Sequence, residues 1–223
     1  MSGYRAIVLG STGAVGRHVV QHLVRSPKCQ AITAVVRRSG SGNDLFGVNS
    51  DKIQITVVDF DALDAELFKG FDIAFSCLGT TRKQAGSAEA FKRVDLDYVV
   101  NTARLLAEAG TKQMFLVTAA NANANSWFLY PQTKGLAEHK VADLKFPRLV
   151  VLRPGFLIRD QTDRLVEKIG VMLTPSYIQV HAEQVARAMV KLADEYDTDI
   201  AKPETIEFVE HSTIKTIAAS SSL

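Results

Sequence analysis

The stretch that decides the fold runs Ala6-Ile7-Val8-Leu9-Gly10-Ser11-Thr12-Gly13-Ala14-Val15-Gly16. The apolar run Ala6–Leu9 is typical of a buried strand, and an amphipathic helical pattern follows the last glycine. Gly10 would permit a tight turn, Gly13 would let the backbone approach a pyrophosphate, and Gly16 would let helix and strand pack closely. Free N–H groups and the helix dipole would then bind the anion. This context in the first βαβ unit favours a dinucleotide-binding loop, with all seven residues from Gly10 to Gly16 at the cofactor, over a plain glycine turn.

Short apolar runs alternate with helical patterns along the rest of the chain. Each run is rich in β-branched residues, as buried parallel strands require, and the runs are Ala6–Leu9, Ile32–Val36, Ile53–Val58, Ile73–Cys77, Met114–Val117 and Leu149–Leu152. The clearest helical pattern covers Ala88–Ala109 and stops at Gly110. This alternation predicts an α/β fold with a doubly wound parallel sheet, the Rossmann fold.

The end of the chain has a looser pattern. We expect one NAD(P)-binding domain over residues 1–223, in which residues 154–181 form a small lid or substrate segment rich in turn residues. A helix at 182–194, a strand at Thr205–Val209 and a short last helix are predicted to follow. This tail is too short to form a separate domain.

The composition limits the partners and the location of the protein. Hydrophobic residues make up 47% of the 223 residues and the formal net charge is +2, which does not favour nucleic acid as a partner. No apolar stretch approaches the ~18 residues of a membrane span, and the opening residues lack a signal-peptide pattern. We therefore expect a cytoplasmic protein with no membrane partner. The tripeptide Ser221-Ser222-Leu223 is a weak match to a peroxisomal address, for which a frayed tail is the preferred interpretation.

Cysteine and histidine give no sign of a disulfide framework or a metal site. Cys29 and Cys77 are isolated thiols, which fits a reducing compartment. His18 and His22 have a helical spacing that can bind metal, but no third ligand accompanies them. We expect no metal.

Two arginines end the second predicted strand. Arg37 and Arg38 stand where an NAD enzyme usually places a carboxylate for the ribose 2′-hydroxyl, and no acid follows before Asp44. Guanidinium groups at this point would hold a 2′-phosphate. The alternative is a pair of solvated charges at a strand end. The pattern favours NADP(H) over NAD(H).

Asp59 and Phe60 end the third predicted strand. Asp59 could accept a hydrogen bond from the adenine amino group while the ring lies in a shallow apolar slot at Phe60. The alternative, an Asp that begins a turn, carries equal weight.

Tyr130 and Lys134 form the candidate catalytic pair. In a helix that begins near Pro131, a phenol and an ammonium four residues apart share a face. A nearby cation stabilises a phenolate, so such a phenol can donate a proton to a carbonyl as hydride arrives. Lys134 would also contact the nicotinamide ribose. The alternative is a surface helix start with an incidental lysine.

These residues together resemble the atypical short-chain dehydrogenase/reductase superfamily, and most closely its Tat-interacting-protein group. The resemblance covers most of the chain and rests on Gly10–Gly16, Cys77–Arg82, Phe91–Asp95, Phe128–Lys134 and Leu152–Gly155. It implies NADP(H) binding, with Cys77, Leu78, Gly79 and Thr80 near the nicotinamide ribose and Arg153 and Pro154 beside them. It also implies that Tyr130 and Lys134 are the retained catalytic pair.

The chain departs from this superfamily at its usual catalytic serine. Alanine stands at the best-matching position in Thr118-Ala119-Ala120, so Thr118 or Ser126 would have to supply the hydroxyl from a shifted position. The loss of a donor to a developing oxyanion typically costs about a hundred-fold or more in rate.

Two hypotheses follow for function. The first is an NADPH-dependent reductase of a small carbonyl compound, with Tyr130 as proton donor. The second is a catalytically weak NADP(H)-sensing regulator that binds a protein partner. The sequence identifies neither the substrate, nor a partner, nor the oligomeric state.

Overall fold

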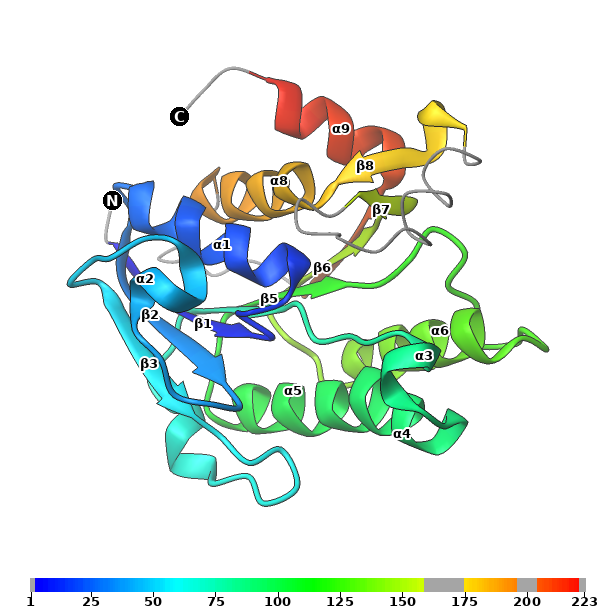
Figure 1. Cartoon of the computed structure of the whole chain (residues 1–223), viewed down its shortest axis with the longest axis horizontal. Coiled ribbons are helices and arrows are strands. Elements are labelled where there is room, and N and C mark those ends of the chain that lie inside the picture. The colour runs from blue at the N-terminus through cyan, green and yellow to red at the C-terminus, as the bar shows by residue number, and fades with distance from the viewer. Residues whose placement is uncertain (1–2, 159–174, 196–203, 221–223) are drawn as a thin grey trace.

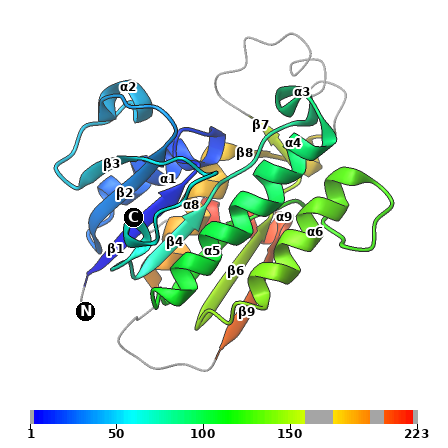
Figure 2. The ribbon, with the colours of Figure 1, turned by 90° about the horizontal axis from the view of Figure 1, so that it is seen from below.

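The computed structural model describes residues 3–158, 175–195 and 204–220. Within them a seven-stranded parallel sheet runs in the order β3-β2-β1-β4-β5-β6-β9 (Figures 1 and 2). Its strands are β1 (Tyr4–Leu9), β2 (Cys29–Val36), β3 (Ile53–Val57), β4 (Ile73–Ser76), β5 (Gln113–Val117), β6 (Arg148–Arg153) and β9 (Thr205–Glu210). The doubly wound Rossmann fold predicted from the sequence is confirmed, and each predicted strand is present within a few residues.

Helices cover both faces of this sheet, as Figures 1 and 2 show. On one face lie α1 (Ala14–Arg25), α2 (Gly42–Phe46), α8 (Ala182–Glu195) and α9 (His211–Ala219), and on the other lie α4 (Ala88–Lys92), α5 (Val99–Glu108) and α6 (Leu129–Ala142). Side chains of β1 alternate between these layers. Ala6 and Val8 pack towards α1 and α8, whereas Ile7 and Leu9 pack towards α5 and α6. A continuous apolar run suits a strand that is buried on both faces.

The helix predicted over Ala88–Ala109 is interrupted. A π-helical turn, Arg93–Tyr98, separates α4 from α5. A π turn contains an additional residue, so it rotates the side chains that follow relative to a regular helix. Phe91 and Val99 both remain in the apolar core, and Asp95 is left buried between them.

Short elements flank these layers. They are the 3₁₀ turns Ala65–Phe68 and Ser176–Ile178, helix α3 (Arg82–Ala85), and the parallel pair β7 (Phe156–Ile158) and β8 (Gln179–His181). Residues 159–174 of the predicted lid, and the tail Ser221–Leu223, lie outside the described residues. Within the part of the chain that is described, no helix has the length and apolar character needed to cross a membrane.

The strand order determines where a ligand can bind. The chain builds β1, β2 and β3 towards one edge and then returns to place β4 on the other side of β1. The loops after β1 and β4 therefore diverge, which opens a crevice at the carboxyl ends of these two strands.

Candidate functional site

A cavity of about 920 Å³ fills this crevice. It extends from the N-terminus of α1 and the end of β2, past the loop after β4, to the first turns of α6. Its volume lies in the range of small-molecule and cofactor sites. Of the predicted site residues, the cavity is lined by Gly10, Thr12, Gly13, Ala14, Val15, Arg37, Phe60, Cys77, Leu78, Gly79, Thr80, Thr118, Tyr130 and Lys134.

The glycine loop has the geometry of an anion site. Gly10 has a φ of +71°, and a Cβ there would lie 2.7 Å from the Cys77 carbonyl oxygen. Gly13 precedes α1 and no side chain caps that helix, whose first turn also lacks acidic residues. Its first N–H groups are therefore available to an external acceptor.

Gly16 and Ser11 belong to this loop but do not line the cavity. A Cβ on Gly16 would lie 2.2 Å from the Gly10 carbonyl oxygen, which gives Gly16 the packing role expected of the third glycine. The Ser11 hydroxyl is fully buried and donates to the Val35 carbonyl oxygen at 2.7 Å. This hydrogen bond ties the loop to β2 and occupies the Ser11 side chain, so the predicted cofactor contact of Ser11 would have to come from its backbone.

Arginine side chains lie at one end of the cavity. Arg37 lines it, whereas Arg38 does not, so the predicted pair of guanidinium groups reduces to one. The sequence analysis missed Arg17, which lines the cavity from the first turns of α1. Neither Arg17 nor Arg37 forms an ion pair with another described residue. Within the described part of the chain, both guanidinium groups are therefore available to an anion.

Asp59 begins a turn. Its carboxylate accepts from the backbone N–H of Asp61 at 2.9 Å, and it lies outside the cavity lining. We therefore correct the adenine role considered for Asp59. Phe60 does line the cavity and stacks on Tyr98, with ring centroids 5.2 Å apart. The flat apolar wall expected at Phe60 is thus built from two rings.

The loop after β4 crosses the middle of the cavity. Cys77 continues β4, since its N–H donates to the Leu9 carbonyl oxygen. Burial raises the pKa of the Cys77 thiol to about 12, so the group stays a neutral small hydrophobe. Gly79 lies next to two charged side chains, because a Cβ there would lie at ordinary contact distance from them, 3.4 Å from an Asp95 oxygen and 3.5 Å from the Lys134 nitrogen.

Tyr130 and Lys134 both face the cavity from α6. The helix begins at Leu129, slightly earlier than predicted, and so places the phenol and the ammonium one turn apart. The Tyr130 hydroxyl has no hydrogen bond to any residue that the structure describes. Its ring lies 5.9 Å from that of Phe91.

Lys134 is paired with an acid that the sequence analysis missed. Its Nζ lies 2.7 Å from Oδ1 of Asp95, and the two side chains are 8% and 1% exposed. Asp95 also accepts from the Thr80 N–H through Oδ2 at 2.8 Å. No local pattern identifies this contact, because Asp95 lies in the π-helical turn, 39 positions before Lys134 along the chain.

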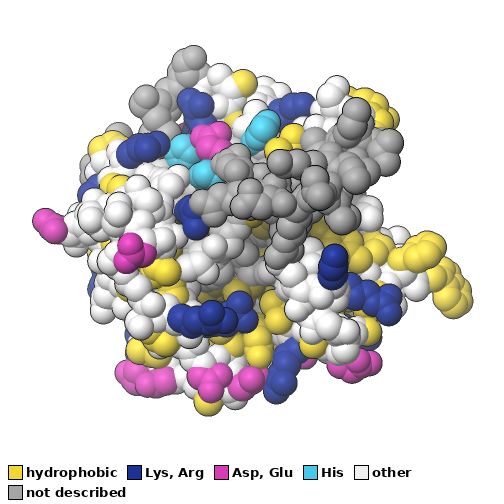
Figure 3. Space-filling view, viewed as in Figure 1, with side chains coloured by type: hydrophobic (Ala, Val, Ile, Leu, Met, Phe, Trp, Pro, Cys, Tyr) yellow, Lys and Arg dark blue, Asp and Glu magenta, His cyan; other side chains and the backbone are white. Residues whose placement is uncertain are grey.

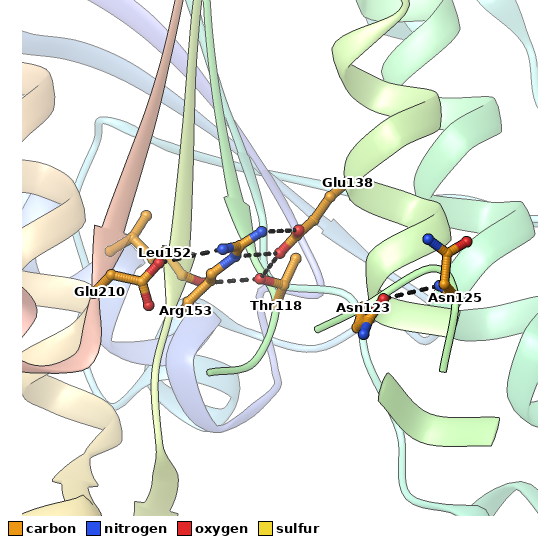
Figure 4. A network of polar contacts seen from close by, with 7 residues as sticks. All are labelled: Thr118, Asn123, Asn125, Glu138, Leu152, Arg153 and Glu210. Carbon is orange, nitrogen blue, oxygen red and sulfur yellow. Dashed lines mark hydrogen bonds and ion pairs between the residues drawn. The ribbon is translucent and has the colours of Figure 1, made fainter. Parts of the chain in front are cut away.

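Thr118 lines the cavity and also belongs to a polar network with residues of α6 and β6 (Figure 4). Its hydroxyl donates to Glu138 at 2.6 Å, with the Leu152 carbonyl oxygen as a second acceptor at 3.3 Å. Glu138 is buried and receives two hydrogen bonds from the Arg153 guanidinium, at 2.6 and 3.0 Å. The Thr118 proton is therefore directed away from a ligand in the cavity.

Arg153 and Pro154 lie outside the cavity lining. The Arg153 guanidinium pairs with Glu138 and Glu210 and lies over the Phe208 ring, 4.3 Å from its centroid. These hydrogen bonds raise the pKa of the guanidinium above its already high ordinary value. We therefore correct the expected cofactor contacts of Arg153 and Pro154, because this arginine joins α6 to the edge of the sheet.

Ser126 does not reach the cavity either. It lies in the loop before α6, where its hydroxyl accepts from the Phe128 N–H at 3.2 Å. This turn replaces the substrate role considered for Ser126. The adjacent Trp127 and Phe128 are 100% and 77% exposed, and Figure 3 shows hydrophobic side chains projecting beyond this end of α6.

Comparison with known proteins identifies relatives of this chain. Residues 10–196 match a family model described as NAD(P)H-binding. The protein HTATIP2 of Rattus norvegicus is 38% identical over 165 residues, which are 73% of this chain and 66% of that protein, just under two thirds. The mitochondrial protein FMP52-1 of Scheffersomyces stipitis is 36% identical over 173 residues, which are 74% of each chain. The resemblance to the Tat-interacting-protein group is confirmed.

Solved structures support the fold. A short chain dehydrogenase from Burkholderia cenocepacia in complex with NADP superposes with a TM-score of 0.68 over 93% of this chain and 88% of that one, at 13% identity. The predicted cytoplasmic location is wrong by the relatives' names, since several yeast proteins similar to this chain are named mitochondrial. Location depends on sorting signals that the fold-determining motifs do not include.

Proposed function

Since this chain belongs to the NAD(P)H-binding family, we propose that it is an oxidoreductase that uses NADPH to reduce a small carbonyl compound. One observation carries the proposal. A single cavity joins the uncapped N-terminus of α1 and Arg37, which has no ion pair with a described residue, at one end to Tyr130 and Lys134 at the other. This arrangement suits a dinucleotide that lies across the carboxyl ends of the strands.

The residues present fit this cofactor. The N–H groups at the start of α1 would hold the diphosphate, and Arg17 and Arg37 would hold a 2′-phosphate. Asp95 is the sole acid in the described lining of the cavity, and it is paired with Lys134. No described carboxylate therefore competes for the ribose 2′-hydroxyl at the end of β2, which supports NADPH over NADH.

The reaction divides between cofactor and protein. When bound, a reduced nicotinamide supplies a hydride to the carbonyl carbon of the substrate. The Tyr130 hydroxyl donates its proton to the carbonyl oxygen, so that the double bond becomes a hydroxyl group. Lys134 lies one helical turn away in the same cavity, where it would hold the nicotinamide ribose.

The Thr118 network favours a second candidate function. Because the Thr118 proton is directed to Glu138, Thr118 does not offer a second hydroxyl donor in place of the usual serine. Such a donor is typically worth about a hundred-fold or more in rate. The alternative is an NADP(H)-sensing regulator with weak turnover, which binds a protein partner.

Two measurements test these functions. Calorimetry with NADPH and NADH reports cofactor binding, and the loss of NADPH absorbance with a panel of aldehydes, ketones and quinones reports turnover. We expect NADPH to bind more tightly, and Tyr130→Phe to abolish turnover while it retains binding. Tyr177→Phe is the matched control, because Tyr177 is exposed and lies outside the cavity.

Each outcome of these measurements has a clear meaning. Turnover that survives Tyr130→Phe contradicts the proton-donor role. Tight binding without turnover favours the regulator. If neither nucleotide binds, both candidate functions fail.

The names of the yeast relatives also suggest a location. We propose that this chain associates with mitochondria. Fractionation of cells that express the tagged chain would test this, and exclusive recovery in the cytosol would contradict it.

A further inference from the structure

The buried pair of Asp95 and Lys134 lines the same cavity as the candidate proton donor, and Lys134 lies one helical turn from Tyr130 in α6. Nζ of Lys134 and Oδ1 of Asp95 are 2.7 Å apart, and both residues line the cavity together with Tyr130. We propose that Asp95 is a positioning residue, which holds the Lys134 ammonium in place and balances its charge beside Tyr130. This inference rests on the proposed function for the identity of the proton donor.

Asp95 joins three parts of the cavity wall. One carboxylate oxygen meets Lys134 on α6, and the other accepts from the Thr80 N–H in the loop after β4 at 2.8 Å. Asp95 itself comes from the π-helical turn, where an additional residue turns this side chain into the cavity while Leu96 stays in the core. π turns are frequent at functional sites. Because both oxygens of the Asp95 carboxylate have partners on other elements, this carboxylate fixes the position of the Lys134 ammonium.

The charge of this carboxylate matters because the Lys134 and Asp95 side chains are only 8% and 1% exposed, so water screens their charges little. An ammonium beside a phenol favours the phenolate, but a carboxylate in contact with that ammonium cancels most of this effect. The other described ionisable groups in the cavity lining include Arg17, His18 and Arg37, which come from α1 and the end of β2 and not from the elements that carry this pair. Cys77, across the cavity, is neutral because burial raises its pKa to about 12, and Glu138, one turn further along α6, is paired with Arg153. Asp95 is thus the acid that balances the charge of Lys134 in this part of the cavity.

Ultraviolet difference titration tests the inference without any need for turnover. Subtracting the titration of Tyr130→Phe from that of the parent protein isolates the ionisation of this phenol. In an Asp95→Asn background, the uncompensated ammonium should move the midpoint to lower pH by about one unit. The Asn side chain can still accept from the Thr80 N–H, so the loop contact is retained.

The chain offers a matched control and an independent variant. Asp97→Asn removes the same charge from an exposed position in the same turn and should leave the midpoint unchanged. Lys134→Gln leaves Asp95 uncompensated and should move the midpoint to higher pH, which keeps the inference testable if Asp95→Asn fails to fold. Equal midpoints for the parent protein and the folded variants would overturn the inference.

This test also separates the inference from the proposed function. If the midpoints move as expected but no carbonyl compound is reduced, the reductase assignment fails and the role of Asp95 stands. If turnover is found but the midpoints stay together, Asp95 is not a positioning residue. Where turnover exists, the pH–rate profile of Asp95→Asn should move in the same direction as its titration.

Discussion

The substitution Gly16→Ala tests the packing on which the cofactor site depends. A Cβ at this position would lie 2.2 Å from the Gly10 carbonyl oxygen and 2.9 Å from the Ser11 Cα. Both neighbours are backbone atoms, so no flexible side chain can move aside. To reach an ordinary contact distance, α1 and the loop after β1 must separate by roughly 1 Å.

The free-energy cost of this separation follows from the usual cost of overpacking a core. Overpacking of a well-packed core typically costs about 1–3 kcal/mol, and the upper half of that range applies where only backbone can yield. We expect the free energy of unfolding to fall by about 2–3 kcal/mol. For a chain of this length that corresponds to a fall in Tm of about 4–12 °C. Differential scanning calorimetry and urea unfolding measure these two quantities.

The same displacement should weaken cofactor binding. A shift of roughly 1 Å takes the N–H groups at the start of α1 out of hydrogen-bond range of a diphosphate. The loss of one hydrogen bond to a charged group, about 1.5–3 kcal/mol, corresponds to about a 10- to 100-fold weaker Kd for NADPH. Isothermal titration calorimetry measures this change.

Gly13→Ala serves as the control for Gly16→Ala. The nearest atom to a Cβ at Gly13 is the Gly10 carbonyl oxygen at 3.1 Å, so a shift of a few tenths of an ångström suffices. Because Gly13 lines the cavity, the methyl group that Gly13→Ala introduces should impair NADPH binding, while the free energy of unfolding should change by less than about 1 kcal/mol. A Gly16→Ala protein with the parent's Tm and Kd would refute the reasoning.

Three further predictions follow from the site and its surroundings. Arg37→Ala should weaken NADPH binding about 10- to 100-fold relative to NADH binding in calorimetry. Arg38 lies outside the cavity, so Arg38→Ala should leave the NADPH/NADH affinity ratio unchanged, and equal effects of the two substitutions would contradict the role of Arg37 in binding the 2′-phosphate. Thr118→Val should lower the free energy of urea unfolding by about 1.5–3 kcal/mol because a buried carboxylate loses a hydrogen bond, while Thr118→Ser retains it. Burial lowers the pKa of His22 below its ordinary value of about 6.5 despite its contact with Glu183. The contribution of His22 to stability is therefore present above that pH and is lost as the pH falls below it. His22→Gln should flatten the fall in unfolding free energy between about pH 7 and 5, and an unchanged slope would contradict this.

Local patterns account for what could be predicted from the sequence. The strand at Ala6–Leu9, the turn at Gly10 and the helix after Gly13 depend on neighbouring residues, so their signals are contiguous along the chain. The placement of Tyr130 and Lys134 on one face of α6 likewise follows from helical spacing. Such features depend on residues that lie close together in the sequence, within one or two helical turns or strands.

Contacts between distant segments account for what could not be predicted. Asp95 meets Lys134 only because α6 packs against a π-helical turn, and that turn has no clear signal in the pattern Ala88–Ala109. Thr118 retains the hydroxyl expected of it, but Glu138, which is paired with Arg153, comes from another element and accepts the hydrogen bond of that hydroxyl.

The sequence by itself therefore determined the Rossmann fold, the glycine loop and the pair of Tyr130 and Lys134. Tertiary structure alone decided which charges are paired, since it joins Lys134 to Asp95 and gives Arg37 no acidic partner among the residues that are described. The physical reason is that strand and helix patterns depend on periodic burial along the chain, whereas the state of a charge depends on atoms within a few ångströms, which folding brings from any position.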